Sequence, residues 1–378
     1  MKTYQENENW IWEGQNFPLF VYNETALDTL YYKFGQLKML EDLLNRESYS
    51  ELMLNVLIDE AISTSAIEGE LLQRSSVRSS INKILKLGLE DDYSYTRESD
   101  ALIEVLLDAK TNLEPLTKDR VFSWHKALFV NGSGLREIKV GAYRTDTEVM
   151  QVVSGAWNKE KVHYLAPPSK EVEHLMDTFF VWLNEDNETS GIYKAVVAHL
   201  YFVLIHPFDD GNGRIARAIT DYVLAKSNLA NGNFYSISTT IYQKRKEYYK
   251  VLDKVCVNVD QDISTWVEWF VNLLELSIDD TLEKVEAVKT KAKFWDRHKE
   301  TKLNERQKKV ILKMLASLPE KFEGGMRVQK YMSITKATRI TASRDLSDLV
   351  EKDVMKSFGS GRGRYYELVY SDDNINTQ

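Results

Sequence analysis

Cysteine and proline are scarce in this sequence of 378 residues, and long apolar runs are missing from it. The single cysteine, Cys256, can build neither a disulfide framework nor a cysteine-rich metal site. The six prolines leave most of the chain free to form helices. No stretch reaches about eighteen consecutive apolar residues, and the first residues lack a basic segment followed by an apolar one. We therefore expect a helix-rich cytoplasmic protein with no membrane segment.

Charge is unevenly distributed along the chain, whose net charge is −8. Residues 303–370 hold fourteen Lys and Arg against eight Asp and Glu, which gives +6, and the tail after residue 370 holds two aspartates. Residues 1–302 therefore carry −12. A basic C-terminal piece on an acidic body is typical of an appendage that faces nucleic acid.

Hydrophobic periodicity separates the chain into regions and predicts a mainly α fold. Helical spacing marks an N-terminal helical region at residues 1–95 and a helical core at residues 96–285. Within the core, residues 141–165 instead predict a β-hairpin, with two short strands around a polar turn and a Pro-Pro pair after them. The charged residues 286–302 are predicted to form a linker helix.

The last region, residues 303–378, predicts three helices followed by a hairpin with a glycine-rich turn. That order is typical of a winged helix-turn-helix domain, with the recognition helix in KATRITASRDLSDLVEKD. Basic residues near the start of this helix and in the wing would meet DNA phosphates: Lys336, Arg339, Arg344, Arg362 and Arg364. Winged helices also serve in dimerisation and protein docking, so both uses stay open.

The segment LIHPFDDGNGRIAR, residues 204–217, places many polar groups directly after an apolar helical run. Pro207 cannot continue the helix, so His206 is expected where the helix stops. The Gly-Asn-Gly at residues 211–213 can turn successive N–H groups inward as an anion-binding nest, at the N-terminus of the next helix. The pattern predicts a phosphate-binding loop, although no GK[ST] of a P-loop is present.

The other polar residues of this segment fit phosphate chemistry. Arg214 and Arg217 lie three positions apart on one helix face and can bind phosphate oxygens in a bidentate manner. Asp210 can hold Mg²⁺, which prefers one or two carboxylates together with substrate phosphates. His206 remains as the proton acceptor, because its ordinary pKa near 6.5 suits a general base at neutral pH.

The same segment matches the Fic family motif, HPFx[D/E]GNGRxxR, at every specified position. The resemblance implies a helical core and the transfer of AMP from ATP to a Ser, Thr or Tyr hydroxyl of a target protein. It implies that His206 deprotonates the hydroxyl, that Asp210 binds Mg²⁺, that Phe208 anchors the loop and that Arg217 contacts the γ-phosphate. The α- and β-phosphates would be held by four residues: Gly211, Asn212, Gly213 and Arg214.

Two further segments resemble parts of Fic proteins. The predicted hairpin at 141–165 corresponds to the flap, which clamps an extended target segment by strand addition. Its residues 150–155 would form the strand edge, with three nucleotide contacts: Val153, Ser154 and Gly155. The segment KRKEYYKVLDKV resembles the adenine side of the site and nominates Tyr248 and Tyr249 for stacking on the base.

The segment TSAIEG, residues 64–69, matches the inhibitory motif of the family, [S/T]xxxE[G/N], through Thr64, Glu68 and Gly69. The resemblance implies that Glu68 pairs with Arg217 and withholds it from the γ-phosphate, so that the α-phosphate is misplaced for attack.

The resulting prediction is an autoinhibited protein adenylyltransferase with an N-terminal helical region, a Fic core with a β-hairpin flap and a C-terminal winged helix. Some relatives transfer phosphate, phosphocholine or UMP, and others remove AMP, so the transferred group stays open. The alternative is a regulator whose winged helix binds DNA while the Fic core senses nucleotide. The sequence also leaves the target protein and a homodimer undecided.

Overall fold

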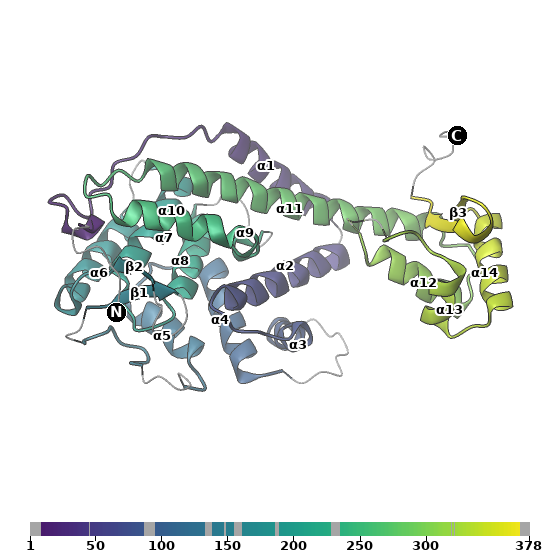
Figure 1. Cartoon of the computed structure of the whole chain (residues 1–378), viewed down its shortest axis with the longest axis horizontal. Coiled ribbons are helices and arrows are strands. Elements are labelled where there is room, and N and C mark those ends of the chain that lie inside the picture. The colour runs from purple at the N-terminus through teal and green to yellow at the C-terminus, as the bar shows by residue number, and fades with distance from the viewer. Residues whose placement is uncertain are drawn as a thin grey trace. The chain divides into compact units, whose positions relative to one another are not determined.

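The computed structural model describes residues 9–44, 46–86, 95–132, 138–146, 149–154, 161–185, 189–227, 235–318, 320 and 322–370. The chain divides into two compact units, Met1–Thr281 and Leu282–Gln378. Fourteen α-helices and two small antiparallel sheets make up the regular structure of these described ranges, which confirms the predicted mainly α class (Figure 1). No helix in the described ranges is long and apolar enough to span a membrane.

The first unit is built around helices α7 (Gly191–Ile205) and α8 (Asn212–Lys226), which pack against each other. Lys194 is the only charged residue of α7, and most of the helix is buried, as its composition requires. Helices α4 (Arg97–Thr111) and α5 (Lys118–Leu128) pack on α8, and α6 (Ser169–Asn184) packs on α7. The loop between α7 and α8 is therefore anchored at both ends by a buried helix.

The N-terminal part of this unit adds a short 3₁₀ helix η1 (Ile11–Glu13) and the helices α1 (Asp28–Leu43), α2 (Arg46–Ile67) and α3 (Arg74–Leu85). Helix α2 packs against α3, α4 and α9 (Ile237–Gln243). Apolar residues of α2, α3 and α4 form one buried cluster that includes Leu57, Val77 and Ile103. This packing fixes the end of α2 relative to α8.

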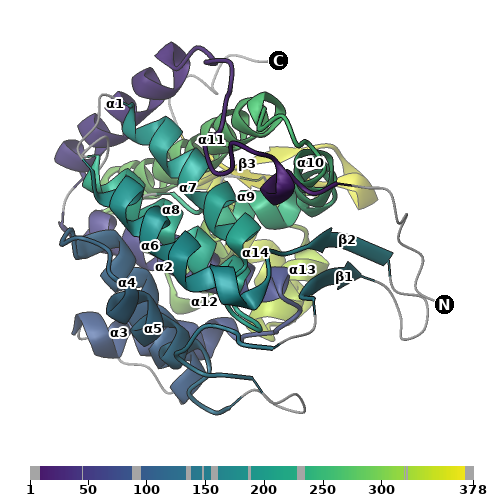
Figure 2. The same ribbon diagram turned by 90° about the vertical axis from the view of Figure 1, so that its left-hand side faces the viewer.

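The hairpin consists of β1 (Gln151–Ser154) and β2 (Lys161–Leu165), with a register shift between Val152 and Val153. Both strands fall within the predicted range of 141–165, but the described residues 141–146, 149 and 150 are not strand. The N-terminal segment supports β2, because Trp12 Nε1 donates to the carbonyl of Leu165 at 2.7 Å. Figure 2 shows β1 and β2 side by side, with the N-terminal segment passing next to β2.

Helix α10 (Arg245–Cys256) contacts β2, and the long helix α11 (Ser264–Arg297) follows it. We expected a core helix and then a separate linker helix at 286–302. The structure has one continuous helix of 34 residues instead, because neither glycine nor proline interrupts the stretch. The predicted domain limits themselves stay predictions.

The second unit contains α12 (Glu305–Leu315), α13 (Val328–Thr335), α14 (Arg339–Glu351) and a hairpin of β3 (Met355–Phe358) and β4 (Tyr365–Leu368). A single bridge between Met326 and Tyr366 adds to this hairpin. All three helices contribute to one core, which includes Ile311, Tyr331 and Leu346. These are the three helices and the hairpin that the sequence predicts for this region.

Candidate functional site

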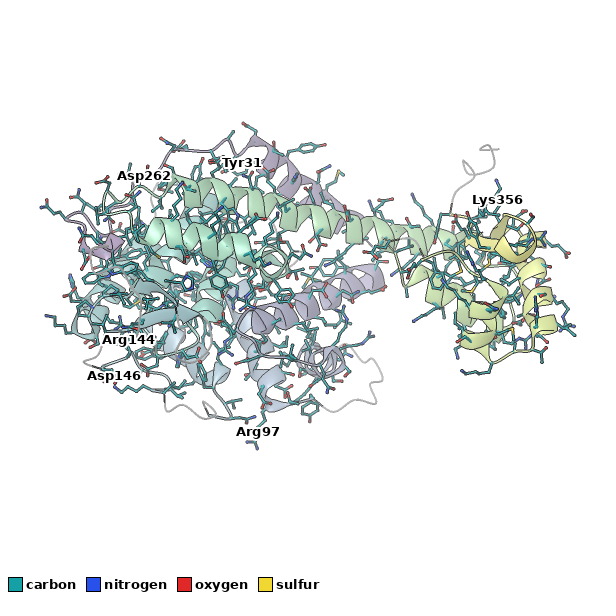
Figure 3. All side chains as sticks on the ribbon, viewed as in Figure 1. Tyr31, Arg97, Arg144, Asp146, Asp262 and Lys356 are labelled. Carbon is teal, nitrogen blue, oxygen red and sulfur yellow. The ribbon has the colours of Figure 1, made fainter. Side chains whose placement is uncertain are left out.

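The loop between α7 and α8 begins at His206, where α7 ends in a left-handed conformation with φ 51° and ψ 57°. The buried Arg144 holds this helix end, since its Nε donates to the carbonyl of His206 at 2.7 Å and its Nη2 donates to that of Pro167 at 2.5 Å. Figure 3 labels Arg144 in the first unit. A cation stabilises the carbonyl end of a helix. No local sequence pattern predicts this role for Arg144, because it lies far from the loop in sequence.

The second half of the loop opens α8. Gly211 adopts a left-handed conformation with φ 81° and is the N-cap of α8. The side chain of Asn212 is turned toward the loop, where its Oδ1 accepts from Phe208 N at 3.0 Å and its Nδ2 donates to Phe208 O at 2.8 Å. Asn212 can therefore offer a phosphate its backbone N–H only. The first N–H groups of a helix have no acceptor within the helix, so this end is suited to an anion.

His125 on α5 holds the loop through its ring nitrogens, and no sequence pattern predicted this role. Its Nδ1 accepts from Gly141 N at 2.9 Å, so its Nε2 carries the proton and donates to the carbonyl of Asp210 at 3.1 Å. The ring also stacks on Phe208 with 4.1 Å between centroids. Burial lowers the pKa of His125 to about 4. A neutral, fixed imidazole thus positions Asp210 and its neighbours.

A cavity of about 620 Å³ opens between this loop, the hairpin and α10. Its volume is in the range that holds small-molecule ligands. It brings together most of the predicted site residues: Glu68, Val153, His206, Asp210, Gly211, Asn212, Gly213, Arg217, Tyr248 and Tyr249. Ser154 ends β1, and Gly155 lies outside the described residues. Figure 1 shows the hairpin and α10 in the same region of the first unit.

His206 has the geometry of a neutral base. Its Nδ1 lies 3.3 Å from the carbonyl of Val203, which accepts the Nδ1 proton and leaves the lone pair on Nε2. The pKa of His206 is lowered to about 4, chiefly by burial; the Val203 carbonyl raises it and the positive charge of Arg144 lowers it by smaller amounts. The imidazole is therefore unprotonated at neutral pH and is able to accept a proton.

Arg217 on α8 is almost fully buried and is held by the end of α2. Its Nε donates to Thr64 Oγ1 at 2.8 Å, and its Nη2 donates to Thr64 O at 3.0 Å and to Glu68 Oε1 at 2.8 Å. The residues of the predicted inhibitory motif thus contact the second arginine of the loop motif. Glu68 itself lies in the turn just after α2.

Arg214 was predicted to hold phosphate, and this role stays a prediction. Its side chain does not line the large cavity but an adjacent one of about 300 Å³, together with Ser65, Glu70 and Phe129. Its Nη1 donates to both carboxylate oxygens of Glu70, at 3.0 and 2.9 Å. A phosphate was expected to bind this guanidinium. In this conformation the carboxylate of Glu70 binds it instead.

The two tyrosines of α10 differ in exposure. Tyr248 is 3% exposed, and its hydroxyl lies 3.1 Å from Nε2 of the buried His199. Tyr249 is 36% exposed and has the guanidinium of Arg245 5.6 Å from its ring centroid. Both line the cavity, which α10 also supplies with three basic residues that we had not selected: Arg245, Lys246 and Lys250. The basic residues on both sides of the Tyr pair in KRKEYYK were the available signal.

Asp210 is suited to contribute one ligand to Mg²⁺. Its Oδ1 accepts from Gly211 N at 2.6 Å, which fixes the carboxylate beside the nest. Three or more metal-ligating side chains do not gather anywhere in the described part of the chain. A single carboxylate fits Mg²⁺ that arrives with substrate phosphates, because this ion keeps most of its coordination for water and phosphate oxygens.

The N-terminus of α8 and the neutral imidazole of His206 line one cavity of small-molecule size. The model of the Fic/DOC family matches residues 115–224, and that of a domain of unknown function, DUF4172, matches residues 10–87. Residues 115–224 thus match a Fic domain, and this range holds the loop, α7 and all but the last two residues of α8.

Comparison with individual proteins agrees with this assignment. The chain is 27% identical over 201 residues to protein adenylyltransferase fic-1 of Caenorhabditis elegans, over 50% of this chain and 34% of that one. It is 28% identical over 123 residues to a uridine 5'-monophosphate transferase of Xanthomonas campestris, over 30% and 22% of the two chains. The chain thus spans about a third of the first relative and less than a quarter of the second. A Fic family structure from Desulfovibrio desulfuricans shares the fold over 93% of this chain and 99% of its own, with a TM-score of 0.52 and 18% identity.

Proposed function

We propose that this protein transfers AMP from ATP to a hydroxyl group of a target protein. The observation that carries the proposal is the presence of His206 and the N-terminus of α8 in the same cavity. The hydroxyl oxygen attacks the α-phosphorus while Nε2 of His206 takes its proton. The bond from the α-phosphorus to the oxygen that bridges the α- and β-phosphates breaks, and pyrophosphate leaves. The N–H groups of α8 stabilise the negative charge on the phosphates.

Two components of the site support ATP as the substrate. Asp210, fixed by Gly211, would hold Mg²⁺ and so supply positive charge to the phosphates. The basic side chains and Tyr249 of α10 also line the cavity, where a base could stack on an exposed ring. One relative is named an adenylyltransferase and another a uridine 5'-monophosphate transferase. The preference of the cavity for one nucleotide base must therefore be measured.

The hairpin is the proposed docking site of the target. Among the described residues, β1 pairs with β2 alone, so its other edge can accept an added strand. Val152 and Val153 line the cavity from this strand. An extended target segment on β1 would carry its hydroxyl residue to His206.

We further propose that the end of α2 restrains the enzyme. Glu68 accepts a hydrogen bond from Arg217. Arg217 would otherwise bind the γ-phosphate and orient the triphosphate for attack on the α-phosphorus. Without that clamp ATP can bind in an unproductive pose.

The experiment is incubation with Mg²⁺ and labelled ATP, GTP, UTP or CTP, followed by intact-mass measurement of the protein and of added cell extract proteins. We expect an AMP-sized addition that His206→Ala abolishes without loss of the fold, because the substitution removes a base and little core volume. Equal labelling by the wild type and by His206→Ala would exclude this role, and preference for UTP would change the transferred group.

A second function, DNA binding by the C-terminal unit, is favoured by the surface of α14. Arg339 and Arg344 are exposed, and Ile340 between them is 83% exposed. The nearest acidic residue, Asp345, is buried, and Arg306 neutralises it at 2.8 Å. The first two turns of this exposed helix face carry basic and apolar side chains, and its exposed acidic residue, Glu351, lies two turns beyond Arg344. Such a helix start suits the major groove of DNA, with the helices and hairpin of this unit interpreted as a winged helix.

The test measures binding of a fluorescent random duplex to the full chain at low and moderate salt. We expect weak binding that falls steeply with salt and is lost in Arg339→Glu/Arg344→Glu, because phosphate contacts release counterions. The double variant Lys308→Glu/Lys309→Glu on α12 is the charge-matched control. Absence of binding at low salt would leave docking or dimerisation as the role of this unit.

A further inference from the structure

The turn that follows α2 has a defined geometry that places two acidic side chains. Gly69 has φ 85°, its N–H donates to the carbonyl of Ala66 at 3.1 Å, and the N–H of Glu70 donates to that of Ser65 at 2.9 Å. These two bonds and the left-handed glycine form a Schellman motif. The chain reverses at Gly69, so that Glu68 and Glu70 both face α8.

Each of these carboxylates holds one arginine of α8. Glu68 contacts Arg217, and Glu70 contacts Arg214 with both oxygens. The two arginines are three positions apart, which places them as neighbours on one face of the helix. One turn of the chain therefore engages both cations of the phosphate-binding loop.

The side chain of Arg214 is buried, but its hydrogen bonds are not all made. Its side chain is 5% exposed, whereas that of Glu70 is 49% exposed. Its guanidinium lies 5.1 Å from the ring centroid of Phe129, and its Nε is buried without a hydrogen-bond partner among the described residues. A buried donor without a partner is unfavourable. A rotation of the side chain toward the large cavity would expose this N–H to a phosphate oxygen.

We propose that Glu70 is a second restraint on the site, which holds Arg214 outside the nucleotide cavity and competes with phosphate for it. This proposal rests on the proposed nucleotide site and extends it, because it names a residue beyond Glu68 that sets nucleotide affinity. Release of Glu68 alone frees Arg217 but leaves Arg214 engaged. Full occupation of the phosphate subsites requires both carboxylates to move.

The test is nucleotide affinity, measured by calorimetry in Mg²⁺ buffer with three ligands. ADP and an ATP analogue with a methylene bridge between the α- and β-phosphates both carry the β-phosphate, which Arg214 would bind. AMP lacks the β-phosphate. We expect Glu70→Gln to bind the first two about three- to tenfold more tightly than the wild type, and AMP unchanged. A half-exposed pair is partly screened by water, which limits the size of the gain.

Two variants control for indirect effects. Glu98 lines the same small cavity as Glu70 and Arg214 and bonds to Asn131 instead, so Glu98→Gln removes a matched charge and should leave affinity unchanged. In an Arg214→Ala background, Glu70→Gln should give no gain. Thermal melts confirm that each variant is folded.

Unchanged ADP affinity in Glu70→Gln, an equal gain in Glu98→Gln, or a gain that survives Arg214→Ala would each overturn the second restraint. The analogue cannot be cleaved between its α- and β-phosphates, so these results do not depend on catalysis. Tighter nucleotide binding by Glu70→Gln without any AMP transfer would contradict the proposed function and support the second restraint. AMP transfer with unchanged nucleotide affinity would support the proposed function and contradict the second restraint.

Discussion

Oxygen Oε1 of Glu68 lies 2.5 Å from the position that a β-carbon on Gly213 would occupy. Gly213 is the second residue of α8, whose first N–H groups would receive a phosphate. The same oxygen accepts from Nη2 of Arg217 at 2.8 Å. Glu68 thus both engages the arginine and stands above the backbone that a phosphate would approach, so its proposed restraint is steric as well as electrostatic.

Replacement of Glu68 by glycine should therefore accelerate AMP transfer. A hydrogen bond to a charged group contributes about 1.5–3 kcal/mol, so we expect Glu68→Gly to be roughly ten- to hundredfold faster than the wild type. Glu68→Gln should gain less, because its side chain still fills the space. The rate of AMP incorporation from labelled ATP is the measurement, and a Glu68→Gly enzyme no faster than the wild type would exclude the restraint.

The gain must depend on Arg217. In an Arg217→Ala background, Glu68→Gly should restore little activity, because no side chain remains to orient the γ-phosphate. The two single variants and the double variant form a thermodynamic cycle that measures this dependence.

Gly69 should act through both carboxylates. Its φ of 85° is unfavourable for alanine or valine and acceptable for asparagine. We expect Gly69→Val to displace Glu68 and Glu70 together, raising the rate of AMP transfer while lowering the free energy of unfolding by about 1 kcal/mol. Gly69→Asn should stay close to the wild type in both measurements. Equal rates of AMP transfer for the valine and asparagine variants would show that the turn at Gly69 does not control the restraint.

His125 is expected to be a positioning residue. The variant His125→Phe keeps a ring against Phe208 but leaves Gly141 N–H and Asp210 C=O without their partner. An unpaired buried polar group costs about 1–3 kcal/mol, so the melting temperature should fall. Because Asp210 is then less firmly placed, more Mg²⁺ should be needed for half-maximal AMP transfer. An unchanged Mg²⁺ requirement would leave His125 a purely structural role.

The sequence predicted the elements of the site better than their contacts. The Gly-Asn-Gly loop, the hairpin near 141–165 and the helical regions follow from local signals, since proline, glycine and periodicity act over a few residues. The contact of Glu68 with Arg217 was expected only through the resemblance to Fic proteins.

The supporting residues were missed because they act over long sequence distances. Arg144 and His125 reach the loop from 62 and 85 positions away. Single buried polar residues of this kind carry no local pattern. The turn at Gly69 was likewise placed in sequence but not in space, so Glu70 and its hold on Arg214 became visible only once α2 was packed beside α8.

Buried neutral histidines should make the fold sensitive to mild acid. Burial lowers the pKa of His125 to about 4 and that of His199 to about 3, whereas an unfolded histidine titrates near 6.5. Below about pH 6.5 the unfolded chain takes up protons that the folded chain does not, so stability falls as pH falls. We expect a loss of about 1 kcal/mol from each histidine at pH 5.5 relative to pH 7.5. Urea midpoints at the two pH values test this, and His125→Phe should show a smaller difference than the wild type.

The lowered pKa of His206 also fixes the expected pH dependence of catalysis. With a pKa of about 4, its imidazole is neutral at pH 6 and above, so base strength rather than protonation limits the reaction there. The value of kcat/KM for AMP transfer should therefore be flat from about pH 6 upward and should decline only as pH approaches 5 or below. The measurement is best made on Glu68→Gly, where the proposed restraint is absent, with unfolding monitored in parallel. A midpoint near 6.5, the ordinary value for histidine, would show that the base in the working enzyme is solvated and that the buried position of His206 is not the catalytic one.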